Sequence, residues 1–315
     1  MKTIVVCLLV ACLGCTGFAQ SVKDRAFQFS FISPIGTNGM NSHETVNMVS
    51  VNLLGGYSYG NKVVEIGGIY NVNIGFTKGL QIAGMVNYSH KGVNPVQLAG
   101  LANIVKKGDV PFQLAGIFNY LECCNGFQMA GVVNVAKRVK GVQLGLVNIA
   151  DESDGVSVGL INVVRNGGKY EFEVSASEAL NTALSFKLGT NRLYTIFSGG
   201  VQYWRMPVEY ALGIGFGTHL DWKYGWANQI ELLGYSYSSN QSFKSDELNC
   251  LLQLRLPVSK QIRPHFKIFA GPVVNMALAD NGKNRDSLFP WTMWHNDGRS
   301  TELKGWIGFC AGVRF

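Results

Sequence analysis

The stretch Leu80-Gln81-Ile82-Ala83-Gly84-Met85-Val86-Asn87 recurs along the chain almost unchanged. Close copies begin at Val96, Phe112 and Phe127, shortened copies at Val142 and Val156, and a looser copy at Glu65. The Gln-type position falls at residues 65, 81, 97, 113, 128, 143 and 157, and Asn closes every unit. A period this regular, of 14 to 16 residues, identifies residues 59–165 as a repeat region.

Each unit alternates apolar and polar residues before a polar turn, which is the periodicity of a β-strand. A unit this short cannot bury a face alone, so neighbouring units have to stack. In one packing each unit is a coil of a parallel β-solenoid, and amide side chains stack along it. In the other, each unit is a strand of one larger antiparallel barrel, with Gln and Asn facing a wet interior.

The shortened units help to distinguish the solenoid from the larger barrel. Gln81 and Asn87 are six residues apart, whereas Gln143 and Asn148 are five apart. Losing one residue from a continuous strand turns every later side chain to the other face, but an Ala-Gly corner between two strands tolerates the loss. The spacing favours the solenoid, although a β-bulge would also accommodate it in a barrel strand. The predicted repeat ladder consists of Gln81, Asn87, Gln97, Asn103, Gln113, Asn119, Gln128, Asn134, Gln143 and Asn148.

The C-terminal half alternates without the repeated phrase. In residues 210–222, Leu212, Ile214 and Phe216 fall on one face, and small or polar residues such as Gly213 and His219 fall on the other. This is the reverse of a soluble sandwich and suits a lipid-facing exterior around a narrow wet interior. Eight such strands are predicted, at 169–175, 182–188, 192–203, 209–222, 226–237, 248–257, 263–276 and 305–315.

The predicted fold is therefore all-β: an outer-membrane antiparallel β-barrel with an inserted repeat region. Residues 20–58 are expected to supply two N-terminal barrel strands and residues 166–315 the C-terminal ones. The short connections at residues 223–225 and 258–262 alternate with long ones at 238–248 and 277–304, as in bacterial barrels.

Residues 1–19 have the form of a secretory signal peptide. Lys2 precedes an apolar run, and Gly17-Phe18-Ala19 predicts cleavage between Ala19 and Gln20. A lipoprotein signal with lipidation at Cys12 or Cys15 is the alternative. Cleavage would leave 26 basic and 20 acidic residues, a net charge of +6. That charge suits outer-membrane lipid or lipopolysaccharide, although it can also serve solubility alone.

The repeated phrase resembles that of the leptospiral-type surface repeat-containing proteins. The leader ending Phe18-Ala19-Gln20, the segment Val51-Asn52-Leu53-Leu54-Gly55-Gly56 and the barrel-like C-terminal half resemble members from Bacteroidota. The resemblance implies an envelope or surface protein and supplies no catalytic or binding residues. The alternating last strand, which ends on Phe315, resembles the signal that the barrel assembly machinery recognises in outer-membrane proteins.

The sequence predicts no catalytic residue, cofactor or metal site. His219 and Asp221 share one strand face, where a hydrated polar lumen explains them better than acid–base chemistry does. No histidine has zinc-ligand spacing, and no basic run is interleaved with aromatic residues, which excludes nucleic acid as an expected partner.

Phe289, Trp291 and Trp294 lie in the long segment before the last strand. They are expected either to bind an unknown surface ligand or to form part of an aromatic belt at the lipid headgroups. The expected function is a non-enzymatic outer-membrane or cell-surface protein with a structural or binding role. A passive pore or transport barrel is the alternative, and an outer-membrane enzyme is a third hypothesis.

Overall fold

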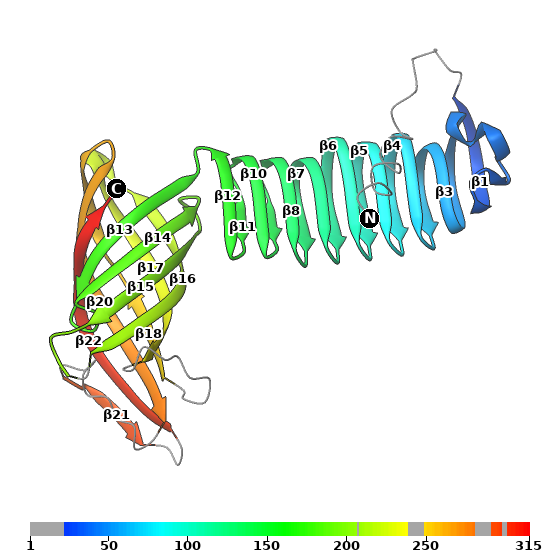
Figure 1. Ribbon diagram of the computed structural model, residues 1–315. Helices are drawn as coiled ribbons and strands as arrows, with labels where there is room; N and C mark the ends of the chain where they lie inside the picture. Colours follow the sequence, from blue (N-terminus) through cyan, green and yellow to red (C-terminus); the bar gives the residue numbers. More distant parts are fainter. Residues whose placement is uncertain (1–21, 207, 239–248, 281–290, 298–300) are drawn as a thin grey trace, which may run out of the picture. The chain divides into compact units, whose positions relative to one another are not determined.

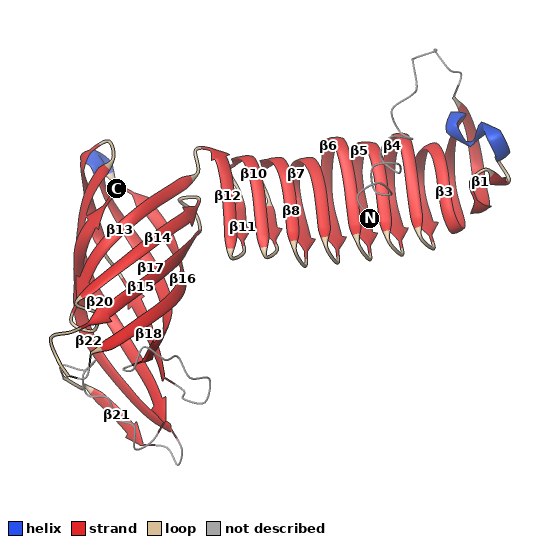
Figure 2. Cartoon of the chain, in the orientation of Figure 1, coloured by secondary structure: helices blue, strands red, loops and turns tan. Residues whose placement is uncertain are grey.

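The structure, a computed structural model, describes residues 22–206, 208–238, 249–280, 291–297 and 301–315. Strands make up 79% of it and there is almost no helix (Figure 2). The all-β prediction is confirmed, and the repeats form a β-solenoid of about seven coils. The signal segment, with Ala19, Gln20, Cys12 and Cys15, lies outside the described residues, as does Phe289. Among the described residues, no helix is long and apolar enough to cross a membrane.

The chain divides into two compact units, Met1–Asp109 and Val110–Phe315, and the division falls within the solenoid strand β6. The elements of the first unit are β1 (Lys23–Ile32), β2 (Ile35–Gly36), the 3-10 turn η1 (Gly39–Glu44), β3 (Thr45–Gly67), β4 (Tyr70–Ala83), β5 (Val86–Ala99) and the first part of β6 (Ala102–Ala115).

In the first unit, successive coils pair in parallel and in register. Asn71 of β4 lies opposite Asn87 of β5, and Gln81 lies opposite Gln97. Residues one repeat apart are therefore hydrogen-bonded neighbours, which is the solenoid arrangement (Figure 1). The alternative, in which the repeats are strands of one larger antiparallel barrel, is wrong.

The N-terminal strands differ from the prediction for residues 20–58. We expected them to join the antiparallel barrel, but β1 pairs in parallel with β3, and β3 pairs in parallel with β4. Gln28 of β1 is buried while Phe27 and Phe29 are exposed. An apolar exterior over a polar interior is expected of a membrane barrel strand and is also the pattern of the coils, so alternation alone could not assign these strands.

The second unit continues with the later coils. Their strands are the rest of β6, β7 (Phe118–Ala130), β8 (Val133–Val139), β9 (Val142–Leu144), β10 (Val147–Ser153), β11 (Val156–Val158) and β12 (Ile161–Asn166). Met129 pairs with Leu144, and Val133 pairs with Val147. The residue missing from the shorter coil is thus lost at the corner between these two pairs, as predicted.

An antiparallel sheet follows the last coil. Its elements are β13 (Lys169–Ser177), β14 (Thr182–Gly189), β15 (Tyr194–Gln202), β16 (Glu209–Asp221), the turn η2 (Lys223–Gly225), β17 (Trp226–Ser238), β18 (Asn249–Arg255), β19 (Val258–Arg263), β20 (Phe266–Asp280), β21 (Trp294–Asp297) and β22 (Thr301–Arg314). Successive strands from β13 to β17 pair with one another; β17 pairs with β18 and β19, both of these pair with β20, and β20 pairs with β22. β22 also pairs with β13, the first strand of the series.

The sheet faces follow the sequence prediction. Leu212, Ile214 and Phe216 of β16 are 37 to 60% exposed, whereas Ala211 is 2% exposed. In β22, Ile307 and Phe309 are exposed, and Cys310 and Arg314 are buried. One connection was predicted wrongly: residues 258–262 form strand β19 instead of a turn. The strand is interrupted at Leu256-Pro257, because proline lacks the N–H that a continuous ladder needs, and it resumes at Val258.

Candidate functional site

The predicted ladder forms inside the coils. In the second unit, the Nδ2 atoms of Asn119, Asn134 and Asn148 each donate to the Oδ1 atom of the next asparagine, at 3.1, 2.9 and 2.8 Å. Each asparagine also donates to a backbone carbonyl of the opposite strand of its coil; Asn134 Nδ2, for example, lies 2.8 Å from Leu144 O. The asparagines therefore tie neighbouring coils together and also link the two faces of one coil.

The glutamines form a second row in the same interior. Gln128 Nε2 donates to Gln113 Oε1 at 3.1 Å, and Gln143 Nε2 donates to Gln128 Oε1 at 2.8 Å. In the first unit, Gln97 donates to Gln81 at 2.6 Å, and Asn87 donates to Asn103 at 2.9 Å. All ten predicted ladder residues are at most 1% exposed. Their role is structural, because they satisfy one another and offer no open face to a ligand.

Glu65 occupies the glutamine position of an early coil. It is completely buried, and its Oε2 atom accepts hydrogen bonds from Asn73 Nδ2 at 2.6 Å and Gln81 Nε2 at 2.9 Å. Burial raises the pKa of Glu65 to about 7, and the hydrogen bonds from the amides oppose that shift. The coil therefore contains a carboxyl group that titrates near neutral pH.

The ladder ends on the antiparallel sheet. Asn162 Nδ2 donates to Thr195 Oγ1 of β15 at 3.0 Å, and Thr195 Oγ1 donates to Gly159 O at 2.9 Å. Thr195 is fully buried. Thr195 thus takes the place that the next asparagine would take, so that the amide of the last coil has a partner.

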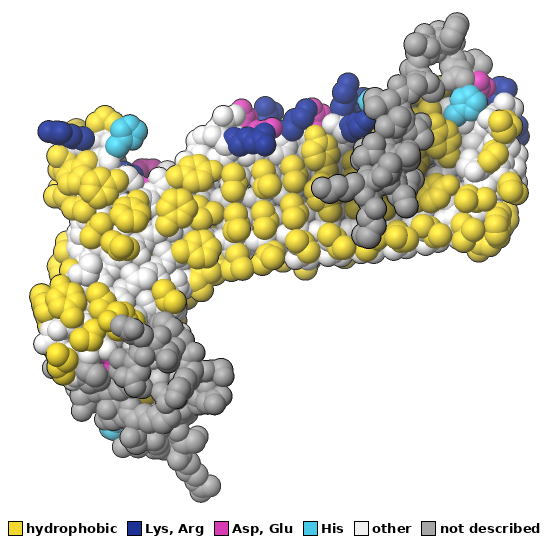
Figure 3. Space-filling model, in the orientation of Figure 1, with side chains coloured by type: hydrophobic (Ala, Val, Ile, Leu, Met, Phe, Trp, Pro, Cys, Tyr) yellow, Lys and Arg dark blue, Asp and Glu magenta, His cyan; other side chains and the backbone are white. Residues whose placement is uncertain are grey.

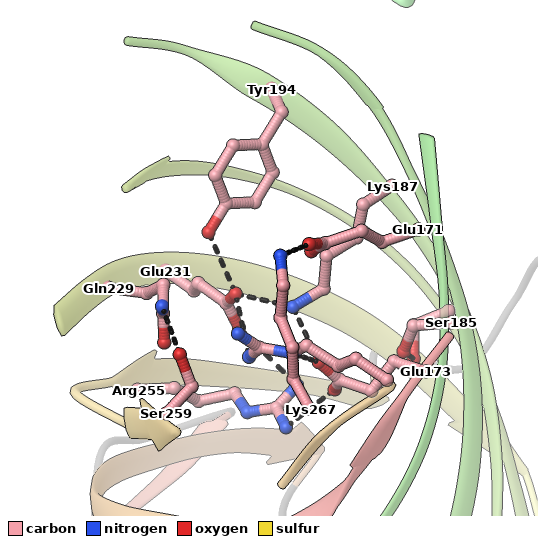
Figure 4. A network of polar contacts seen from close by, with 12 residues as sticks. Glu171, Glu173, Ser185, Lys187, Tyr194, Gln229, Glu231, Arg255, Ser259 and Lys267 are labelled. Atoms are coloured by element: carbon pink, nitrogen blue, oxygen red, sulfur yellow. Dashed lines mark hydrogen bonds and ion pairs between the residues drawn. The ribbon is translucent and has the colours of Figure 1, made fainter. Parts of the chain in front are cut away.

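A network of charged side chains fills the inner side of the antiparallel sheet (Figure 4). Glu173 of β13 accepts from Lys187 at 2.5 Å, Arg255 at 2.9 Å and Arg314 at 2.7 Å. Glu231 of β17 contacts Lys187 and lies 3.2 Å from Arg314 Nη2. All five side chains are at most 3% exposed. Charges this deeply buried are stable only when they are paired with one another.

Aromatic side chains complete the network. Tyr194 donates its hydroxyl hydrogen to Glu231 Oε1 at 2.8 Å, and the Lys187 ammonium lies 5.7 Å from the centre of the Tyr194 ring. The Arg314 guanidinium lies 4.1 Å from the centre of the Phe269 ring. Three cations and two aromatic rings thus surround two carboxylates, so the network can hold together the strands that carry them.

A second charged group adjoins the first. Glu171 lies 3.0 Å from Lys169 and 2.5 Å from Lys267, and Lys169 Nζ lies 3.3 Å from His219 Nδ1. His219 Nε2 is 2.9 Å from Asp221 Oδ1, so the pair noted in the sequence does form. Within the described residues, no group of three or more His, Cys, Asp and Glu side chains is arranged to hold a metal ion.

Sequence reasoning missed the residues of this network. The available signal was the alternation in Tyr170-Glu171-Phe172-Glu173, where carboxylates occupy every position opposite the apolar face. Carboxylates that point inward from one strand need cations that point inward from other strands, but the alternation within one strand does not identify those cations. Lys187, Arg255 and Arg314 come from three further strands, and only the pairing of those strands brings them to Glu173.

The described tryptophans of the predicted binding loop both lie along β22. Trp291 and Trp294 are each 51% exposed. Trp291 Nε1 donates to Ile307 O at 3.1 Å, and Trp294 belongs to β21, which pairs with β22. These residues therefore extend the sheet, and the ligand predicted for them stays a prediction.

No family model, no curated protein and no solved structure matches this chain.

Proposed function

We propose that this chain is a non-enzymatic outer-membrane protein in which a closed β-barrel anchors a solenoid of structural or binding role. The pairing circuit supports closure, because every strand from β13 to β22 in the circuit has a paired neighbour on each side. β18 and β19 share the same two neighbours and count as one interrupted strand, and β21 is appended to β22. Eight strands therefore go around the proposed barrel, an even number as in bacterial barrels.

The outer face supports a lipid environment. Phe172, Phe186 and Phe309 are 44 to 58% exposed and lie on different strands. β16 and β17 each have 13 residues, which exceeds the 9 to 11 or so that a tilted strand needs to cross a bilayer. An apolar exterior of sufficient height around a polar interior is the arrangement that barrels in membranes require.

The observation on which the proposal mainly rests is the charged network around Glu173 and Glu231. Its side chains come from opposite parts of the circuit and meet in the interior, with Tyr194 and Tyr235 beside them at 0 to 1% exposure. Eight-stranded barrels are just wide enough for side chains to fill. A filled interior supports an anchor and disfavours the alternative of a passive pore.

The test combines membrane insertion with conductance. The folded full chain is reconstituted into liposomes, and co-flotation with lipid establishes insertion before planar-bilayer recording, with a trimeric porin as the positive control. We expect co-flotation, a heat-dependent shift on a denaturing gel and no discrete conductance steps. Reproducible steps would overturn the anchor in favour of a pore, and failure to float with lipid would overturn the membrane barrel itself.

A further inference from the structure

The solenoid coils are inside out compared with a soluble protein. Their interior holds the amide rows, whereas the side chains that point outward from both faces are apolar. On one face of the second unit these are Val133, Val135, Val147 and Ile149. On the other they are Phe127, Met129, Val142 and Leu144. Figure 3 shows one face of the coils β7 to β12, where the apolar side chains form yellow rows.

The two edges of the coils differ in chemistry. We call the corner between the Gln and Asn positions the apolar edge; in the second unit it consists of a glycine followed by Ile117, Val132, Leu146 or Leu160, each 40 to 48% exposed. We call the opposite turns the charged edge, which includes Glu122, Lys137–Lys140, Asp151–Asp154 and Arg165. No charged residue occurs among the coil residues between the two edges in the second unit.

Pairs of opposite charge connect successive coils along the charged edge. Lys137 lies 3.3 Å from Glu122, Arg138 lies 3.3 Å from Glu152, and Arg165 lies 2.9 Å from Asp151. All of these side chains are 38 to 68% exposed. The blue and magenta side chains over β7 to β12 gather along one margin in Figure 3, while the opposite margin is yellow. The coils are therefore amphipathic across their width.

The width of the apolar band matches one leaflet of a bilayer. From Leu146 at the apolar edge to Ala150, the last residue before Asp151, a strand takes four steps of roughly 3.3 Å, which is about 13 Å. Half of a hydrocarbon core of about 30 Å is about 15 Å, so the band fits within one leaflet. Four coils spaced by about 4.8 Å then expose roughly 250 Å² on each face, and both faces together equal the largest apolar patches of monomeric soluble proteins.

The coils of the first unit show the same pattern independently. Ile69, Met85 and Leu101 occupy the apolar edge at 36 to 43% exposure. The charged edge of this unit is basic, with Lys78, Lys91 and Lys106–Lys107 against Asp109. A basic edge beside an apolar band fits the anionic headgroups that lie above acyl chains.

We propose that the solenoid binds a lipid bilayer by burying both apolar faces and the apolar edge in one leaflet, with the charged edge at the level of the headgroups. Backbone groups in lipid need internal partners, and the parallel coils provide them through strand pairing and the asparagine contacts to carbonyl groups. This membrane surface is additional to the barrel and does not depend on it, because it follows from the coils alone.

The test uses the wild-type full chain in liposomes that contain a phospholipid with a diazirine at the end of one acyl chain. After irradiation, labelled peptides are mapped by mass spectrometry. We expect label on the peptides containing Val132, Leu146 and Leu160 at a level similar to that on Leu212 and Ile214 of β16. A second phospholipid with the diazirine in its headgroup should label the peptide containing Lys137–Lys140 instead.

The outcomes separate this proposal from the proposed barrel. Acyl-chain label confined to the antiparallel strands would overturn the solenoid proposal and leave the barrel standing. Label on the coils but not on β16 would support the solenoid proposal and overturn the barrel. Unlabelled coils that cross-link face to face between two chains would show that a second copy covers the apolar faces, and would also overturn the proposal.

A matched pair of variants tests the edges directly. The double variant Leu146→Lys/Leu160→Lys places charge on the apolar edge, where both side chains are exposed and the fold can tolerate it. We expect acyl-chain labelling of these coils to fall at least about fivefold. Asp154→Lys is the matched variant at the level of the headgroups, where an added cation should not lower the acyl-chain labelling. Equal labelling in the wild type and the double variant would contradict the proposal.

Discussion

Arg314 and Glu173 lie directly opposite each other where β22 pairs with β13, and Arg314 Nε donates to Glu173 Oε2 at 2.7 Å. The contact joins the last strand of the antiparallel sheet to the first. Both side chains are at most 1% exposed, so the ion pair is screened from water. The ion pair therefore depends on the pairing of β22 with β13, and its removal should lower the free energy of unfolding.

Glu173→Gln tests this ion pair while preserving the shape of the side chain. It leaves Glu231 as the only carboxylate of the network facing Lys187, Arg255 and Arg314. We expect the free energy of unfolding to fall by about 3 to 5 kcal/mol, because buried charge is left unpaired. Urea titration of the protein folded in detergent, followed by heat-dependent gel mobility, measures the change.

The double variant Glu173→Gln/Lys187→Met serves as the control, because it removes one charge of each sign. It should lose less stability than Glu173→Gln alone, and a larger loss would contradict the charge-balance explanation. Phe172→Leu, on the exposed face of the same strand, should change stability little.

Asn134→Ala tests the ladder. The amide of Asn134 donates to Leu144 O and Asn148 Oδ1, and its Oδ1 atom accepts from Asn119. Removing the amide breaks these three buried hydrogen bonds, and the free energy of unfolding should fall by about 2 to 4 kcal/mol. Native-state hydrogen exchange should show the loss of protection in the adjacent strands β7 and β10 first, because each coil contacts only its neighbours. Val135→Ala, which points outward, is the control; equal losses from both variants would refute a special role for the amide.

Gly131→Ala tests the corner of the coils. A Cβ atom at this position would lie 2.4 Å from the carbonyl oxygen of Gly116 in the preceding coil. Because both partners belong to the backbone, we expect the coils to separate slightly at a cost of about 1 to 3 kcal/mol. Val132→Ala at the same corner removes exposed apolar surface and should change thermal stability by less. A Gly131→Ala variant as stable as the wild type would show that the corner is not closely packed.

Glu65→Gln tests the titrating group in the early coil. Burial raises the pKa of Glu65 to about 7 from a reference value of 4.5, so the folded coil binds the proton more tightly than the unfolded chain does. The stability of this coil should be highest below pH 4.5 and should fall by a few kcal/mol as the pH rises to 7.

The glutamine variant should abolish that pH dependence, because the next five coils already use glutamine at this position. Hydrogen exchange in β3 and β4 between pH 4.5 and 8, corrected for intrinsic exchange rates, measures the effect, with Glu122→Gln at the exposed charged edge as the control. A pH dependence that persists in Glu65→Gln would assign the titration to another group.

The repeats could be predicted in detail because each coil is built from residues that are close together in the sequence. A period of 14 to 16 residues places Gln81 beside Gln97, and Asn134 beside Asn148, once the units stack in parallel. The missing residue between Gln143 and Asn148 likewise located the corner. Stacking of identical units leaves one register that keeps the amides inside.

The N-terminal strands could not be assigned in this way. Phe27 and Phe29 alternate with Gln28 and Ser30, which suits either a barrel strand or a coil, because both have polar interiors and apolar exteriors. Parallel pairing with β3 decides the matter. The pairing of two strands depends on contacts between segments that are distant in the sequence, and the alternation within either segment does not determine it.

The sequence by itself identified the repeat units, favoured the coils, and predicted the rows of Gln and Asn and the outward faces of the antiparallel strands, because strand alternation and a short repeat are local properties. Only the tertiary structure decided that Glu173 meets Lys187, Arg255 and Arg314, that Asn162 ends on Thr195, and that β13 pairs with β22. Each of these contacts joins different strands. The physical reason is that a buried charge takes its partner from whichever strand the complete sheet places opposite it, and that choice exists only after folding.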